Sequence, residues 1–264
     1  LNKFEPQRDY ASAILDKYLD KTDQRQRATD IVFGTLRNLI AIDTVINSLS
    51  GCPVKRIQNK LLNIIRIGCY EIIYTPSTGE HSIVNEAAQN AKAIASPRQV
   101  GFVNALLRQI IRNVKNRQTP LPQANLIRTL PQNIDTGCEF DSDFLPDGTK
   151  NIAEYLSTVF SLPLWLVTDW LNEFGNDRAR QICFGCNRRP GFYIRPNTLK
   201  TTLQDLVAKF QEEDIEVETI ENEPILRIKS PSVVSQLPGF NEGQFVVQDL
   251  TASLPVRLLN PKQS

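Results

Sequence analysis

The chain has 264 residues, 41% of them hydrophobic and 22% charged, which is enough for one large or two ordinary domains and excludes collagens, mucin-like stalks and wholly disordered chains. Its net charge of +1 hides an asymmetry: residues 1–128 contain 18 Lys or Arg and 10 Asp or Glu (+8), whereas residues 129–264 contain 12 and 19 (−7). A basic half joined to an acidic half indicates a polyanion-binding module beside something else, and no stretch approaches the ~18 apolar residues of a membrane span.

Residues 9–115 show helical periodicity with short connections, which predicts a compact helical bundle. The segment 54–75 is apolar around much of its circumference, so we expect a central, buried helix with Pro53 suited to its first turn. Ser82 is a candidate cap for a later helix. The predicted helices span residues 9–19, 24–49 (broken near Asn38), 54–75, 82–95 and 98–115.

Prolines and carboxylates gather between residues 116 and 150. This composition predicts a linker, partly mobile, which we assign to residues 129–150.

From residue 151 the pattern becomes mixed. Alternating apolar residues predict strands, a capping box formed by Thr201 and Gln204 predicts a helix start, and Gly175 is a candidate C-cap between two helices. The predicted strands are 191–195, 215–219, 225–228 and 244–247, and the predicted helices are 163–174, 177–186, 201–212 and 250–259. Residues 151–264 are therefore expected to form a small α+β domain.

Two candidate reactive sites are better explained structurally. Cys183 and Cys186 have the CxxC spacing of a zinc or redox site, but no second ligand pair exists and the pair ends a predicted helix. His81 is the only histidine and has no evident partner. The chain has no GxGxxG, GxxxxGK[ST], GxSxG or HExxH motif. We therefore expect no metal, catalytic or cofactor-binding residues in this chain. Five cysteines form no disulfide framework, which favours a reducing compartment.

Basic residues of the first half lie mostly near predicted helix ends, where they suit an RNA backbone. Few aromatic residues interleave with them, so the signal for single-strand stacking is weak there. A solvated basic face is an equally good reading of the charge alone. The candidates are Arg25, Arg27, Arg37, Lys55, Arg56, Lys60, Arg66, Arg108, Arg112, Lys115 and Arg117.

Four segments of the first half resemble the NusB-like domain of the bacterial RsmB (Sun, Fmu) family of small-subunit rRNA cytosine-5 methyltransferases. They are FGTLR (33–37), LLNIIRIGCYEIIY (61–74), VNEAA (84–88) and GFVNALLR (101–108). The second half continues the resemblance in family order with LPLWLV (162–167), NRRP (187–190) followed by RPN (195–197), and PGFNEGQFVVQD (238–249). Pro196 replaces the family's usual valine, which questions the local strand pairing.

The resemblance implies a catalytic domain that binds S-adenosylmethionine through a Gly-rich turn and uses two cysteines, in Pro-Cys and Thr-Cys contexts, for covalent catalysis. None of the five cysteines here has either context. We therefore expect this chain to be inactive alone and to need no cofactor. Gln248 and Asp249 are then structural: Asp249 caps the helix beginning at Leu250, and Gln248 bonds across the preceding turn.

The hypothesis from the sequence is an α+β multidomain chain in three parts. Residues 1–128 form a NusB-like RNA-binding bundle, 129–150 a linker, and 151–264 an α+β domain preceding a methyltransferase domain. With no methionine and Leu1 first, the chain is expected to be part of a longer, cytoplasmic bacterial protein that binds small-subunit rRNA. The RNA contacts are assigned to Arg25, Arg27, Arg37 and Arg108. The alternatives are a stand-alone NusB-like RNA-binding or antitermination module and a remnant that has lost RNA binding.

Overall fold

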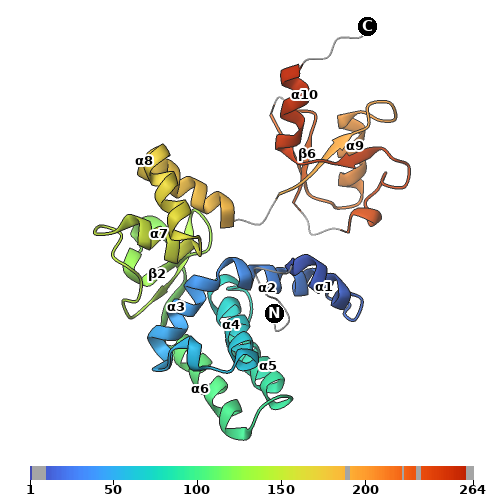
Figure 1. The fold of residues 1–264 in the computed structure, drawn as a ribbon. Coiled ribbons are helices and arrows are strands. Elements are labelled where there is room, and N and C mark those ends of the chain that lie inside the picture. Colours follow the sequence, from blue (N-terminus) through green and yellow to red (C-terminus); the bar gives the residue numbers. More distant parts are fainter. Residues whose placement is uncertain (2–9, 188–190, 222, 230–232, 260–264) are drawn as a thin grey trace. The chain divides into compact units, whose positions relative to one another are not determined.

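A computed structural model describes Leu1 and residues 10–187, 191–221, 223–229 and 233–259 (Figure 1). The chain divides into two compact units, Leu1–Arg188 and Arg189–Ser264. Each unit has its own apolar core, so each is described by itself.

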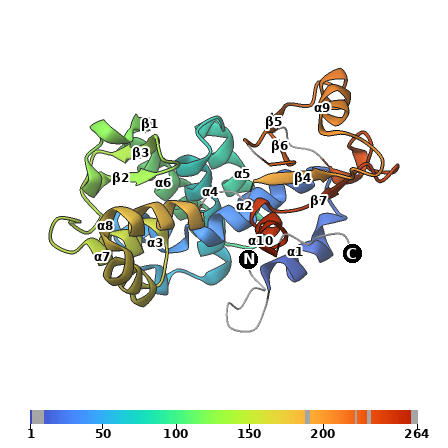
Figure 2. The same ribbon diagram turned by 90° about the horizontal axis from the view of Figure 1, so that it is seen from above.

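The first unit begins with helices around a buried central one. Their bounds are α1 Ala11–Leu19, α2 Arg25–Arg37, α3 Leu39–Ser50, α4 Asn59–Tyr74, α5 Glu80–Lys92 and α6 Pro97–Asn113. Helix α4 packs against α2, α3, α5 and α6 (Figure 2). It buries Ile65, Ile72 and Ile73 completely. The predicted central helix and the break at Asn38 are confirmed.

Two helix starts differ from the prediction. Residues Val54–Arg56 form a 3-10 turn, and α4 begins only at Asn59 because Ile57 and Gln58 are extended. Helix α5 starts after Gly79, so Ser82 lies exposed inside its first turn rather than capping it. The cap of α6 is a capping box between Ser96 and Gln99, which satisfies free amides at the helix start.

The expected linker is folded. Residues 114–140 form an antiparallel sheet in the order β1-β3-β2, with β1 at Val114–Pro120, β2 at Thr129–Pro131 and β3 at Thr136–Phe140. Leu130, Cys138 and Phe140 are fully buried in the core shared with the helices. Pro120 and Pro131 end the two outer strands, where they cost no ladder bond, and Pro122 lies in the turn after β1. The apolar residues between the carboxylates, rather than the prolines, therefore determine that this segment folds onto the core.

Helices α7 (Ile152–Phe160) and α8 (Leu164–Asn187) complete the first unit. Leu156, Val159 and Val167 belong to its core. The first compact unit therefore extends to residue 188, past the bounds predicted for the bundle (1–128) and the linker (129–150) and into the predicted α+β domain (151–264). The break in α8 at Gly175, where φ is +74°, confirms the predicted interruption between two helical segments.

The second unit is a four-stranded antiparallel sheet in the order β5-β6-β4-β7 with one helix on it. Its elements are β4 Phe192–Pro196, α9 Leu203–Glu212, β5 Val217–Thr219, β6 Leu226–Ile228, β7 Phe245–Val247 and α10 Leu254–Leu259. Pro196 still pairs with Phe245 at the end of β4. Helices followed by a small α+β unit confirm the predicted fold class.

Local capping in this unit is shifted from the prediction by one residue. The N-cap of α9 is Thr202, whose hydroxyl accepts from the amide of Asp205 at 3.1 Å, rather than Thr201. Asp249 caps the next turn as predicted, accepting from the amide of Thr251 at 2.8 Å. The side-chain amide of Gln248 donates forward to the Ala252 carbonyl at 3.2 Å, not across the preceding turn.

Candidate nucleic-acid interface

Two stretches of the first unit contain no carboxylate. Residues 44–70 and 87–134 lack Asp and Glu but contain 11 Lys or Arg. They include the end of α3, most of α4, the end of α5, the whole of α6 and the strands β1 and β2. A surface built from them is positively charged unless carboxylates from elsewhere neutralise it.

Helix α6 presents a continuous basic face. Arg98, Arg108 and Arg112 are exposed on one side of it, with the exposed small residues Gly101 and Ala105 between them. We call these five residues the α6 stripe. Arg112 follows Arg98 by 14 positions, which span ~21 Å at a rise of 1.5 Å per residue. Among the described residues, no carboxylate pairs with any of its three arginines, and Arg108 is bonded only to Asn104, at 3.2 Å.

The α6 stripe continues onto the start of α4. The side-chain amide of Gln99 in the first turn of α6 donates to Gln58, the residue before α4, at 3.3 Å. This bond brings Arg98 to the neighbourhood of Lys55, Arg56 and Lys60, which are all exposed and, in the part of the chain that the structure describes, unpaired with acids. Two helix N-termini add partial positive charge here. We call Lys55, Arg56, Lys60 and Arg98 the basic end.

The structure does not bring the four predicted RNA-contacting arginines together. Arg25 pairs with Asp20 at 2.7 Å, and Arg27 pairs with the buried Glu71 at 3.2 Å. Arg37 is half-buried at the other end of α2, ~18 Å from Arg25 along the helix. Only Arg108 lies on the α6 stripe.

Other basic candidates have internal structural roles. Arg66 forms two hydrogen bonds to the carboxylate of Asp43, at 2.7 and 2.8 Å. Arg117 donates to backbone carbonyls at 2.8 to 3.0 Å, and Lys115 pairs with the buried Glu139 at 3.1 Å. The prediction missed Arg98, and the carboxylate-free stretch around it was the signal that would have found it.

No metal centre or reactive thiol pair emerges from the described residues. Among them no group of three His, Cys, Asp or Glu side chains could hold a metal ion. Cys183 is fully buried, and desolvation raises its pKa to about 11, whereas Cys186 is exposed. His81 is exposed on α5. These positions give no support to metal or thiol chemistry.

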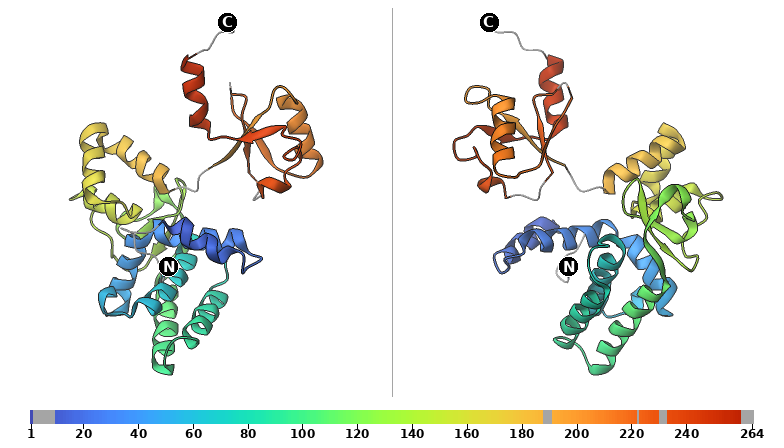
Figure 3. Two further views of the ribbon diagram at one scale, coloured as in Figure 1. Left: turned by 45° about the vertical axis from the view of Figure 1, so that its right-hand side comes forward. Right: turned by 180° about the vertical axis from the view of Figure 1, so that it is seen from behind.

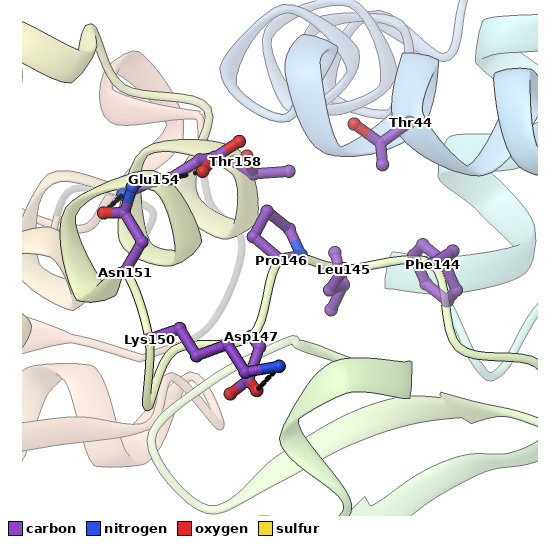
Figure 4. A pocket seen from close by; sticks show the side chains of 9 residues that line it. All are labelled: Thr44, Phe144, Leu145, Pro146, Asp147, Lys150, Asn151, Glu154 and Thr158. Atoms are coloured by element: carbon purple, nitrogen blue, oxygen red, sulfur yellow. Dashed lines mark hydrogen bonds and ion pairs between the residues drawn. The ribbon is translucent and has the colours of Figure 1, made fainter.

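A pocket of about 580 Å³ lies between α3 and the segment from Phe144 to Thr158 (Figure 4). Its lining includes Asp147, Glu154 and a single cation, Lys150, which already pairs with Asp147 at 3.4 Å. Hydrogen bonds from Thr149 lower the pKa of Asp147, so it stays ionised. The net negative lining disfavours phosphate, and this pocket is not part of the candidate interface.

The described residues do not fit a site for S-adenosylmethionine of the kind that the sequence resemblance implies. Such a site uses a Gly-rich turn between a parallel strand and a helix, whereas every strand pair in the described part of the chain is antiparallel. In the same part, no helix is both long and apolar enough to cross a membrane.

Two family models match the chain in order. Residues 3–112 match the NusB family, and residues 162–235 match the RsmF/B-like methyltransferase ferredoxin-like domain. The first match covers α1 to α6 and therefore includes the α6 stripe and the basic end. The second covers α8 and much of the four-stranded sheet.

Curated relatives align over nearly the whole chain. "Ribosomal RNA small subunit methyltransferase B" of Proteus mirabilis is 28% identical over 89% of this chain and 48% of its own length. The protein of Bacillus subtilis called probable ribosomal RNA small subunit methyltransferase B is 25% identical over 99% of this chain and 53% of its own length. The chain thus spans about half the length of the curated relatives it matches.

A solved structure, the crystal structure of PH0851, has the same fold. It matches with a TM-score of 0.58 and 20% identity over 98% of this chain and 52% of that one.

Proposed function

We propose that this chain, whose NusB domain and RsmF/B-type ferredoxin-like domain are those of the N-terminal region of the RsmB family, binds small-subunit ribosomal RNA and presents it for methylation of a cytosine at carbon 5. Methyl transfer and binding of S-adenosylmethionine are assigned to the half of such proteins that this chain does not span. The setting is the bacterial cytoplasm, where ribosomal RNA is made and modified.

The single observation that carries RNA binding is the α6 stripe with the basic end. Guanidinium groups bind phosphate through two parallel hydrogen bonds, and their desolvation costs less free energy than that of an ammonium group. Gly101 and Ala105 leave the helix surface between the arginines low, so a sugar-phosphate backbone can approach it closely. Among the described residues no carboxylate pairs with these arginines, so no acidic side chain there opposes the polyanion.

This proposal replaces part of the first assignment of RNA contacts. Arg108 remains a proposed contact, and Arg37 remains a proposed contact at a separate position on α2. Arg25 and Arg27 already satisfy carboxylates, so an RNA phosphate would have to compete with Asp20 and Glu71 for them. The main phosphate contacts are therefore assigned to Arg98, Arg108 and Arg112 with the rest of the basic end.

The alternative, a NusB-like antitermination module without an enzymatic partner, is less well supported. A ferredoxin-like domain of the RsmF/B type follows the bundle, and the relatives that share both domains are named as methyltransferases.

The test is binding of the full chain to small-subunit rRNA fragments across a salt series. Each phosphate contact releases condensed counterions, so the logarithm of the affinity should fall linearly with the logarithm of the salt concentration. Affinity that does not change with salt, or no affinity at all at low salt, would contradict the proposal.

A further inference from the structure

The four-stranded sheet of the second unit has one face covered and one face open. Helix α9 packs on the face that carries Ile194, Leu226 and Phe245 (Figure 3). Because side chains alternate along a strand, the residues between these point to the opposite face. Among the described residues, only the short helix α10 follows the sheet, and its main contacts are with the turn that precedes it.

Tyr193 is the aromatic residue on the open face. Its neighbours in β4, Phe192 and Ile194, pack into the core with α9, whereas Tyr193 is not part of that core. Its ring lies over the backbone of Gly191: a Cβ atom built at Gly191 would be 2.4 Å from the ring edge. The glycine therefore allows the ring to lie flat on the sheet at the start of β4.

Two arginines flank this ring. Arg227 of β6 is directly opposite Tyr193, and Arg195 lies two residues further along β4, opposite Val246. Side chains in such positions have Cβ atoms ~5 to 7 Å apart. Arg195 is exposed and, within the described chain, has no acidic partner.

Arg227 is also available to a ligand. It pairs with Glu218 at 3.5 Å, but both side chains are nearly half exposed, at 47% and 44%. Exposed pairs of this kind hold each other weakly. The nearby carboxylates, Glu216 and Glu218, lie just before the edge strand β5 or in it. They repel a polyanion at that edge, which favours its binding over β4 and β7.

We propose that the open face formed by Tyr193, Arg195 and Arg227 binds single-stranded RNA, with one base stacked on the tyrosine ring and the adjacent phosphates held by the arginines. Four-stranded antiparallel sheets with exposed aromatic residues bind unpaired bases in this way. The inference rests on the proposed function, because both surfaces take RNA. It adds a division of labour: the α6 stripe contacts phosphates, and the second unit reads an unpaired nucleotide.

The experiment uses the full chain and a short single-stranded RNA that contains the fluorescent base 2-aminopurine. Stacking on Tyr193 should quench the fluorescence, and Y193A should abolish the quenching and weaken binding about tenfold, with an unchanged salt slope. Y193F keeps the ring and should behave as wild type. R195A should weaken binding and reduce the salt slope by about 1. L199A, which removes a 93% exposed apolar side chain of the same unit, is the matched control.

The outcomes separate the two proposals. If the wild-type chain binds no RNA at any salt concentration, the proposed function fails. If it binds with the expected salt dependence while Y193A and R195A bind and quench like wild type, only the assignment of the sheet face fails. Should Y193A unfold, as judged by circular dichroism, R195A alone decides: wild-type affinity and slope would overturn the inference.

Discussion

Gln132 binds Arg117 and the end of helix α4 at the same time. Its side-chain amide donates to the Arg117 carbonyl at 2.8 Å and to the carbonyl of Ile73. The Arg117 guanidinium donates to the carbonyls of Glu71 and Ile72, both at 2.9 Å. The last turn of a helix leaves carbonyls without partners and carries partial negative charge, so a cation that forms several hydrogen bonds there is doubly favourable. The small sheet therefore caps the central helix.

Replacing Arg117 with lysine should destabilise the first unit by about 2–3 kcal/mol, because an ammonium cannot reach carbonyls on several sides at once. Thermal unfolding of R117K measures this. Arg112→Lys, on the α6 stripe, is the matched control and should leave the melting temperature unchanged. Equal melting temperatures for the two variants would show that the cap does not contribute to the stability of the first unit.

Alanine in place of Arg98 or Arg112 should weaken RNA binding and reduce the salt slope by about 1 per residue, without loss of thermal stability. Neither side chain has an internal partner among the described residues, so the fold loses nothing. R178A is the control, since Arg178 is exposed and, in the described part of the chain, forms a side-chain hydrogen bond only with Gln181, at 3.0 Å. An unchanged slope in both variants, measured by filter binding, would remove the α6 stripe from the interface.

Arg27→Ala should have the opposite effect: it should lower thermal stability and leave RNA affinity nearly unchanged. Glu71 is buried, and without Arg27 its carboxylate keeps no partner among the described side chains, which costs about 1–3 kcal/mol. We expect a lower melting temperature and little change in RNA affinity. The paired measurement distinguishes an RNA contact from a structural residue, and intact stability with lost binding would restore Arg27 to the interface.

Gly34→Ala should destabilise the bundle by about 1–3 kcal/mol, because a Cβ atom there would lie 2.1 Å from the Tyr70 ring. Gly101→Ala is the counterpart. Nothing lies within 4 Å of a Cβ at Gly101, so better helix propensity should stabilise α6 by about 0.5–1 kcal/mol. Denaturant unfolding measures both, and two changes of the same sign would contradict the packing argument.

Thiol labelling should separate the two cysteines of the CxxC pair. Cys186 is exposed and should react readily at neutral pH, whereas Cys183 is buried with its pKa raised to about 11 and should react only on unfolding. Since the pKa of Cys183 is higher in the folded state than its ordinary 9.0, its contribution to stability is full below pH 9 and falls as the pH rises through 11. Equal labelling rates at pH 7 would show that the site is open.

The elements could be predicted from sequence wherever apolar residues recur at a regular period. The central helix and the strands of the second unit follow from such patterns. The sheet at 114–140 could not, because burial does not alternate regularly along β1 or β3, and its acidic residues and prolines outweighed Leu130 and Phe140 in composition. The ion pairs of Arg25 and Arg27 were missed for another reason. The sequence shows where a cation lies along the chain, but it does not show that Glu71, distant in sequence, lies beside Arg27.

The cap on α4 also determines which shortened fragments of the protein can fold. The NusB match ends at residue 112, but a fragment ending there would lose Arg117 and Gln132 and uncover the apolar surface beneath Leu130 and Phe140. The end of the family match and the end of the compact unit thus lie at different residues of the chain. The fragment that inherits the fold of the bundle is the one that continues through α8, and recombination between relatives is expected to respect residue 188 rather than residue 112.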